Sequence, residues 1–203
     1  GASFIVLEDS SSDHILDIPD VLTAKVTPLL IAGGGGAVSA DSTGNDASLT
    51  ENSTGYNPNT KVGYGCTHGN GSGGGGFLTG GRAYNASTTG GKGFLQGGAG
   101  GIGSRKGGFG GGAGGYDENG SGGGGYTGGP GYDGPSGGGG SYFAPTVEDT
   151  SAGLHTERED GLITINLLEG EESGFLAYDE NLGAAYYDLA EGAWVSVSQW
   201  AEV

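Results

Sequence analysis

Half of one long stretch of this chain is glycine. Of the 72 positions from Gly69 to Gly140, 36 are glycine, which leaves 15 glycines among the other 131 of the 203 residues. Ordering a glycine costs more backbone entropy than ordering any other residue, and glycine has no side chain whose burial offsets that cost. At roughly 1–2 kcal/mol per residue, fixing the 36 glycines of the block costs on the order of 36–72 kcal/mol. Such a block is either disordered or held by a dense lattice of backbone hydrogen bonds.

Aromatic residues within the block favour the ordered alternative, because disordered segments are poor in aromatics. They recur through the block, often directly after a glycine run: Phe77, Tyr84, Phe94, Phe109, Tyr116, Tyr126 and Tyr132. We expect glycine rods of the polyproline II type, which make no internal hydrogen bonds and direct every N–H and C=O to neighbours. The aromatics would cap the rod ends. Collagen is excluded, because there is no strict G-X-Y repeat and only six prolines are present.

The changes in composition divide the chain into four parts. Residues 1–32 are expected to form β-strands that lead into the glycine block, and residues 33–141 form the bundle of polyglycine II-type helices. Residues 142–168 are expected to form the strands that leave it, and residues 169–203 a β-rich tail. The apolar runs that predict strands are 2–7, 26–32, 162–167, 175–178, 184–189 and 194–200. The predicted fold class is therefore mainly β, with little or no α-helix.

Several runs in this order are similar to a known extracellular domain. They are 1–7, 26–36 (VTPLLIAGGGG), 70–77 (NGSGGGGF), 107–115, 122–129, 137–143 and 161–165. Together they resemble the glycine-rich domain of the anaplastic lymphoma kinase and leukocyte tyrosine kinase receptors, over roughly residues 1–168. The resemblance implies a glycine-helix bundle inserted between strands of a β-sandwich like the tumour-necrosis-factor jelly roll. In those receptors the domain recognises small protein ligands.

Three departures from that family change the expectation. The family has further strands before the position of Gly1, and it carries cysteines in this domain and in a growth-factor-like module after it. This chain has Cys66 alone, and residues 169–203 match nothing in the family. No ligand-contacting residue of the receptors maps onto a recognisable motif here. We therefore expect a relative of the domain that is used elsewhere, not a kinase receptor.

The departures also predict self-association. A jelly roll that lacks strands exposes unpaired edges and an apolar face, which another chain fills by strand addition. We expect residues 2–7 or the 194–203 end to pair with a neighbouring copy or a cleaved partner fragment. The candidate assembly residues are Phe4, Val6, Trp194, Val195, Val197 and Trp200. Because the chain contains no methionine and no signal peptide, we expect it to be a processed product or a cut-out piece.

Charge excludes some partners and is unevenly distributed. A net charge of −17 argues against nucleic acid, whose binding face must be basic. No apolar run approaches the roughly 20 residues of a membrane helix, so we expect no membrane insertion. Residues 52–116 contain five bases and no acid, whereas the rest of the chain has 24 acids and two bases. This basic block either satisfies itself within one molecule or directs neighbouring copies to pack against it.

Sequons and one cysteine are the remaining candidate sites. Four N-glycosylation sequons, at Asn52, Asn70, Asn85 and Asn119, favour a secreted, extracellular glycoprotein. Cys66 excludes an internal disulfide framework and a cysteine-built zinc site. In a secreted chain it is instead a candidate for an intermolecular disulfide. Its spacing from His68 is interpreted as incidental, since no third group of a catalytic set lies nearby in the sequence.

Other motifs carry no chemistry. The nucleophile-elbow match at residues 134–138 is expected by chance in a glycine block and does not sit between a strand and a helix. Oxygen-rich turns at residues 117–120 and 179–181 lack EF-hand spacing, so we interpret them as solvated turns rather than calcium sites. We expect no catalytic residue, no metal and no cofactor.

The sequence thus predicts a non-enzymatic extracellular structural or interaction subunit of a fibre, surface appendage or matrix. It would assemble through β-strand edges on a rigid glycine-helix scaffold. One alternative is a receptor-ectodomain module that binds a basic protein ligand through an acidic face. Another is an adhesin or an ice-binding surface displayed on a flat array of helices.

Overall fold

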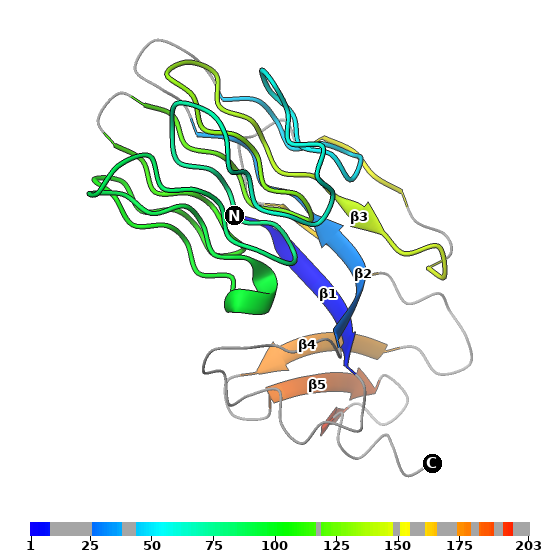
Figure 1. Ribbon diagram of the computed structural model, residues 1–203. Coiled ribbons are helices and arrows are strands. Elements are labelled where there is room, and N and C mark those ends of the chain that lie inside the picture. The colour runs from blue at the N-terminus through cyan, green and yellow to red at the C-terminus, as the bar shows by residue number, and fades with distance from the viewer. Residues whose placement is uncertain are drawn as a thin grey trace. The chain divides into compact units, whose positions relative to one another are not determined.

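The apolar runs on either side of the glycine block form a small antiparallel sheet. Strand β1 (Ser3–Glu8) pairs with β2 (Val26–Ala32), and β2 pairs with the short β3 (Tyr142–Phe143). Both β2 and β3 are continuous with glycine segments, because β2 runs into Gly33 and β3 follows Gly140 and Ser141. The sheet therefore lies where glycine segments begin and end (Figure 1).

One irregularity interrupts this sheet. Ile5 pairs with Leu30 and Val6 pairs with Pro28, so Leu29 is an extra residue of a bulge in β2. Pro28 lacks a backbone N–H and cannot donate to a ladder, which places the bulge beside it. The carbonyl of Leu29 accepts a hydrogen bond from the Ala144 N–H at 2.8 Å instead.

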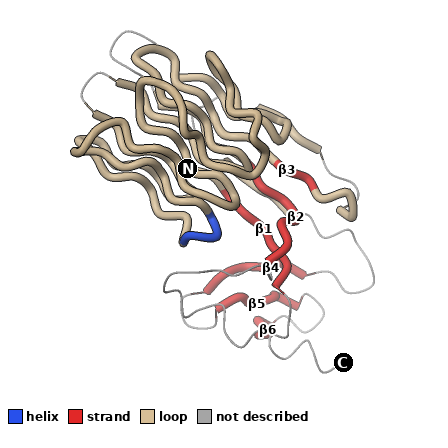
Figure 2. The backbone as a smooth tube through the Cα atoms, in the orientation of Figure 1, coloured by secondary structure: helices blue, strands red, loops and turns tan. Residues whose placement is uncertain are grey.

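The computed structural model describes residues 1–8, 26–37, 44–116, 119–147, 151–154, 161–165, 174–179, 183–188 and 193–196. The chain forms two units, Gly1–Ile163 and Thr164–Val203. Most of the described residues in the first unit are neither helix nor strand, and Figure 2 draws them as loop. The regular helix among them is a single 3-10 turn, η1 (Phe94–Gln96).

These loop segments nevertheless run side by side and are bonded to one another. Segment 71–77 is buried along its whole length and shares backbone hydrogen bonds with six other segments. They are 63–66, 79–83, 89–94, 110–115, 120–125 and 127–131. The same neighbouring segment recurs at every third residue. Segment 127–131 accepts from Gly71 at Gly131 and from Gly74 at Gly129, and segment 120–125 donates from Gly122 to Ser72 and from Gly125 to Gly75. Segment 89–94 likewise donates from Gly91 to Gly73 and from Phe94 to Gly76. Each of these segments thus presents successive residues to different neighbours.

This close approach of backbones explains why the segments are glycine. A Cβ on Gly74 would lie on the carbonyl oxygen of Gly123, and a Cβ on Gly75 would lie on the carbonyl oxygen of Lys92. Consecutive positions of one segment therefore face the backbones of different segments, with no room for a side chain. The buried hydrophobic side chains are correspondingly few among the residues described: Ala2, Ile31, Cys66, Phe77, Ala113 and Ala144.

The expected sandwich is not what the described residues of the first unit form. They contain the single three-stranded sheet β1–β3, with no sandwich or barrel. The predicted strand at 162–167 differs as well, because residues 162–165 are not a strand and residues 166–167 lie outside the described part. The reason is local: Gly161 donates to the Gly1 carbonyl at 3.2 Å and accepts from the Ser3 hydroxyl, so this segment is held at one point and not along a ladder.

The second unit contains a separate antiparallel sheet. Its strands are β4 (Gly174–Asp179), β5 (Gly183–Asp188) and β6 (Ala193–Ser196), in that order. These strands lie at the apolar runs that predict them, although the end of the third run, residues 197–200, lies outside the described residues. Within the part of the chain that the structure describes, no helix is long and apolar enough to cross a membrane.

Candidate assembly surfaces

Five aromatic rings form a continuous ladder between the sheet and the glycine segments. Phe4 on β1 stacks on Phe94 with ring centroids 4.5 Å apart, and Phe94 stacks on Phe77 at 5.5 Å. Phe77 contacts Tyr126 at 6.1 Å, and Tyr126 stacks on Tyr142 of β3 at 4.5 Å. Aromatic pairs at such separations contribute about 0.5–1.5 kcal/mol each beyond the area that they bury. The ladder therefore joins both edge strands of the sheet to the ends of two glycine runs.

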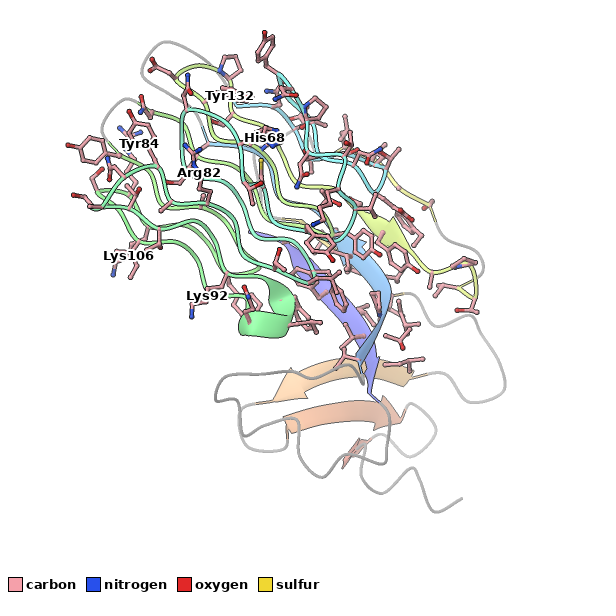
Figure 3. All side chains as sticks on the ribbon, viewed as in Figure 1. His68, Arg82, Tyr84, Lys92, Lys106 and Tyr132 are labelled. Carbon is pink, nitrogen blue, oxygen red and sulfur yellow. The ribbon has the colours of Figure 1, made fainter. Side chains whose placement is uncertain are left out.

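The other aromatics that we expected to cap rods lie elsewhere. Tyr84 contacts Tyr116 at 6.3 Å, and Tyr56 contacts Tyr132 edge-on at 5.7 Å. Figure 3 places Tyr84 and Tyr132 at the end of the glycine segments away from β1–β3. Phe109 is 67% exposed. Aromatic pairs thus lie at both ends of the lattice, and Phe109 stands outside them.

The ladder changes what Phe4 is able to contribute to assembly. Its ring is half-buried against Phe94, so the side chain is occupied within the molecule. The other candidate on this strand, Val6, is half-buried and lies opposite Pro28. What β1 still offers is its outer backbone edge, since within the described residues Phe4–Glu8 have no backbone bonds except those to β2. Leu7, 55% exposed, lies on the same strand.

The C-terminal assembly candidates are only partly placed. Trp194 pairs with Tyr187 and Val195 pairs with Tyr186 in the register of β5 and β6. Strand β6 has one strand neighbour, β5, in its sheet. Val197 and Trp200 lie outside the described residues.

The four sequon asparagines differ in exposure. Asn52 and Asn70 are exposed, whereas Asn85 and Asn119 are half-buried. Asn85 uses its side-chain oxygen to accept from the Ser87 N–H at 2.8 Å. The backbone N–H of Asn119 donates to the Tyr116 carbonyl at 2.9 Å. Asn52 and Asn70 therefore offer the more accessible amide groups.

Cys66 lies inside the lattice. Its relative exposure is 0%, and its thiol donates to the His68 carbonyl at 3.5 Å, with the His68 Nδ1 also 3.5 Å away. Burial raises the pKa of the Cys66 thiol, and this effect outweighs the His68 hydrogen bond and the charge of Arg82, which lower the pKa. A thiol so placed cannot reach a thiol of another chain without opening the lattice, which argues against the expected intermolecular disulfide. The raised pKa also makes it a weak nucleophile at neutral pH.

The five bases of residues 52–116 fall into two groups, a distinction that the sequence did not indicate. Lys61 lies over the ring of Tyr64, 3.7 Å from its centroid, and Arg82 donates to the carbonyls of Ala83 and Gly69. All five bases are exposed, so the other three, Lys92, Arg105 and Lys106, differ from Lys61 and Arg82 in their contacts and not in their exposure. Within the described residues no side chain contacts their charged groups.

The sequence analysis also did not identify two buried polar side chains. Asn59 donates to the carbonyls of Tyr64 and Gly128 at 3.0 and 3.4 Å, and it accepts from the Lys61 N–H. Thr127 is fully buried and accepts from the Gly63 N–H at 3.0 Å. Both satisfy backbone groups where a segment turns. Among the described residues no cluster of three or more His, Cys, Asp or Glu side chains is placed to hold a metal ion.

Comparisons with protein-family models, with curated proteins and with solved structures find no match to this chain. The resemblance to the glycine-rich receptor domain therefore stays a prediction that rests on the sequence runs alone.

Proposed function

We propose that this chain is a non-enzymatic extracellular subunit of a fibre, surface appendage or matrix. In this proposal a bundle of polyglycine II-type helices, set between jelly-roll-like strands, is a rigid scaffold. The outer edges of the β-strands make contacts between subunits. Neighbouring copies or a partner chain supply the pairing strands.

The observation that carries the proposal is the recurrence of the same neighbour at every third residue along segment 71–77. Three residues per turn and hydrogen bonds that leave the helix are the properties of the polyproline II conformation. No residue of this segment has a positive φ, and Gly93 has φ −64° and ψ 156°, close to that conformation. A segment bonded to six others has little freedom to move alone, which suits a scaffold.

Two further observations support the contact surfaces and the compartment. The outer edge of β1 has no backbone partner among the described residues, and such an edge is a template for another strand. The exposed sequon residues Asn52 and Asn70 support an extracellular location. The buried, weakly acidic Cys66 supports the non-enzymatic part of the proposal.

The proposal is tested by the mass of the full chain in solution and by one substitution on the β1 edge. The wild-type chain is expected to form species several times heavier than its 19.9 kDa in light scattering coupled to size exclusion. Leu7→Lys places a charge on the edge strand and is expected to reduce the associated fraction at least tenfold. Leu162→Lys is the matched control, because Leu162 is 68% exposed and lies outside any strand.

A wild-type chain that stays at the mass of one subunit at all concentrations would overturn the proposal. A monomer that binds a cationic protein more weakly as salt rises would identify the receptor-module alternative. A monomer that shapes ice crystals would identify the ice-binding alternative.

A further inference from the structure

We propose that the basic edge of the glycine lattice docks on the acidic edge of a second copy of this chain. The basic edge is defined by Lys92, Ile102, Arg105, Lys106 and Phe109, and the acidic edge by Asp46, Leu49 and Glu51. This inference rests on the proposed function, since it names a surface through which a self-assembling subunit adds copies. It differs in the contact, which is made by the sides of the lattice and not by β-strands.

The basic edge carries three cations that have no charged or aromatic partner among the described residues. Lys61 and Arg82, the other bases of the block, are engaged by an aromatic ring and by carbonyls. Lys92, Arg105 and Lys106 are exposed, and within the described residues no acid or aromatic ring contacts them. Figure 3 shows Lys92 and Lys106 on the same side of the glycine segments.

Two large, exposed apolar side chains lie close in the sequence to two of these cations. Ile102 is 64% exposed and Phe109 is 67% exposed, and both belong to the same stretch as Arg105 and Lys106. Exposed apolar groups next to charged ones are typical of an interface with another protein. Sulfated or phosphorylated small ligands would use the cations but would leave the two apolar side chains uncovered.

The acidic edge has the complementary composition. Asp46 and Glu51 are exposed, and Leu49 between them is 42% exposed. No cation contacts either carboxylate within the described residues. The edge thus has, along the sequence, an exposed apolar residue between two exposed anions, opposite in charge to the first edge.

The two edges lie on opposite sides of the lattice. Backbone hydrogen bonds connect them through intervening segments, for example in the order 44–54, 136–141, 120–125, 110–115 and 98–103. Figure 1 shows the 44–54 segment in cyan and the 98–108 segment in green on opposite flanks. Among the described residues no ion pair joins the two edges within one molecule. A contact between two different, complementary surfaces is heterologous and repeats, so it produces a row of copies.

Paired charge reversals test the docking. Lys92→Glu with Lys106→Glu makes both edges acidic, and Asp46→Lys with Glu51→Lys makes both edges basic. Each double variant is expected to raise the apparent dissociation constant of self-association at least tenfold in sedimentation velocity. An equimolar mixture of the two is expected to associate again, because each basic edge meets an acidic one. Asp133→Lys, an exposed change outside the residues that define the two edges, is the control and should associate as the wild type does.

Net charge alone predicts a different result. The Asp46→Lys, Glu51→Lys variant changes the net charge from −17 to −13 (two changes of +2), so weaker general repulsion would increase its association. The edge contact predicts a decrease. Association of the wild type is also expected to fall with added salt, as the Debye length shrinks from about 30 Å at 0.01 M to about 3 Å at 1 M.

The inference is overturned if both double variants associate as the wild type does, or if their mixture gains nothing over the separate variants. In the first case a loss of association in Leu7→Lys would leave the proposed function standing. If the wild type itself is a monomer, the inference and the proposed function both fail. Thermal unfolding of each variant at 1 M salt, where the charges of the edges are screened, identifies any variant that fails to fold. If a charge-reversal variant does not fold, the neutral substitution on the same edge, Lys106→Gln or Glu51→Gln, replaces it. Each neutral substitution is expected to weaken association at least threefold.

Discussion

Phe77 and Tyr126 are joined twice, by a backbone hydrogen bond from the Phe77 N–H to the Tyr126 carbonyl at 2.8 Å and by a ring contact at 6.1 Å. Each residue directly follows a run of four glycines. Glycine segments have no side chains that distinguish one register from another. This pair sets two of them at the same level, and the rest of the ladder aligns that level with β1 and β3.

The ladder of five aromatic rings predicts a loss of stability when its middle is removed. Phe94→Ala removes the ring that lies between Phe4 and Phe77, and it should lower the free energy of unfolding by about 2 kcal/mol, less than the roughly 3–5 kcal/mol of a fully buried phenylalanine. Urea denaturation with an unchanged slope measures this loss. Phe109→Ala, at a ring that is 67% exposed, should change stability by less than about 0.5 kcal/mol. Equal effects at the two positions would show that the ladder does not hold the sheet to the lattice.

The lattice predicts that glycines differ sharply in tolerance. A Cβ on Gly74 would lie on the Gly123 carbonyl oxygen, whereas a Cβ on Gly134 meets nothing within 4 Å. Gly74→Ala is therefore expected to destabilise the chain by about 3 kcal/mol or more, since backbone on both sides must move. Gly134→Ala should be neutral or stabilise by about 0.4–1 kcal/mol, because alanine restricts the unfolded chain. Comparable urea midpoints for the two variants would contradict the lattice.

The apolar runs of the sequence indicated most of the strands but not the one at 142–143, they wrongly indicated one at 162–165, and they did not indicate the arrangement of the strands. The glycine content and the interspersed aromatics indicated an ordered lattice, and the apolar runs at 2–7, 26–32 and in the tail coincide with β1, β2 and β4–β6. Which segments are neighbours was not predictable, because segment 71–77 and segment 120–125 present the same glycine backbone to any partner. The ring contacts of the aromatic ladder were not predictable either, because Phe4 and Tyr142 lie far from Phe94 and Tyr126 in sequence and no sequence pattern links them.

The candidate surfaces were likewise predictable only in part. The uneven charge of residues 52–116 was visible in the sequence. What separates Lys61 and Arg82 from the three cations that have no partner among the described residues is their contact with Tyr64 and with backbone carbonyls. The exposure of Cys66 was likewise not predictable. A lone cysteine in a glycine-rich loop has no periodicity that indicates which way it faces, and the structure buries it.

The sequons predict modification in a secretory host. Asn52 and Asn70 are exposed, so a glycan at either site projects into solvent without displacing a neighbour. Glycopeptide mass spectrometry of secreted chain is expected to find glycans at both, and Asn70→Gln should remove one glycan mass without changing the unfolding temperature. Asn85→Gln is the contrasting variant, because the asparagine oxygen also accepts the hydrogen bond from the Ser87 N–H. The glutamine oxygen lies one methylene further from the backbone, so this variant weakens that hydrogen bond as well as removing the sequon. Unmodified asparagine at all four sequons would contradict an extracellular location.

Burial of Cys66 predicts a pH dependence of stability. The folded state raises the pKa of this thiol, so the unfolded chain loses its proton first as the pH rises above about 8.5. The folded state then binds more protons than the unfolded state, and the free energy of unfolding falls by at most about 1.4 kcal/mol per pH unit until the folded thiol ionises as well. The contribution is fully present below pH 8. Urea unfolding at pH 8.0, 8.7 and 9.4 should show this decline in the wild type, whereas Cys66→Ala should show a flatter profile over the same range.

A disulfide-exchange reagent supplies an independent measurement of the burial of Cys66, since it should react with the native thiol at least tenfold more slowly than with the unfolded chain. Rapid native reaction, or identical pH profiles for the two chains, would mean that the thiol is not enclosed by the lattice.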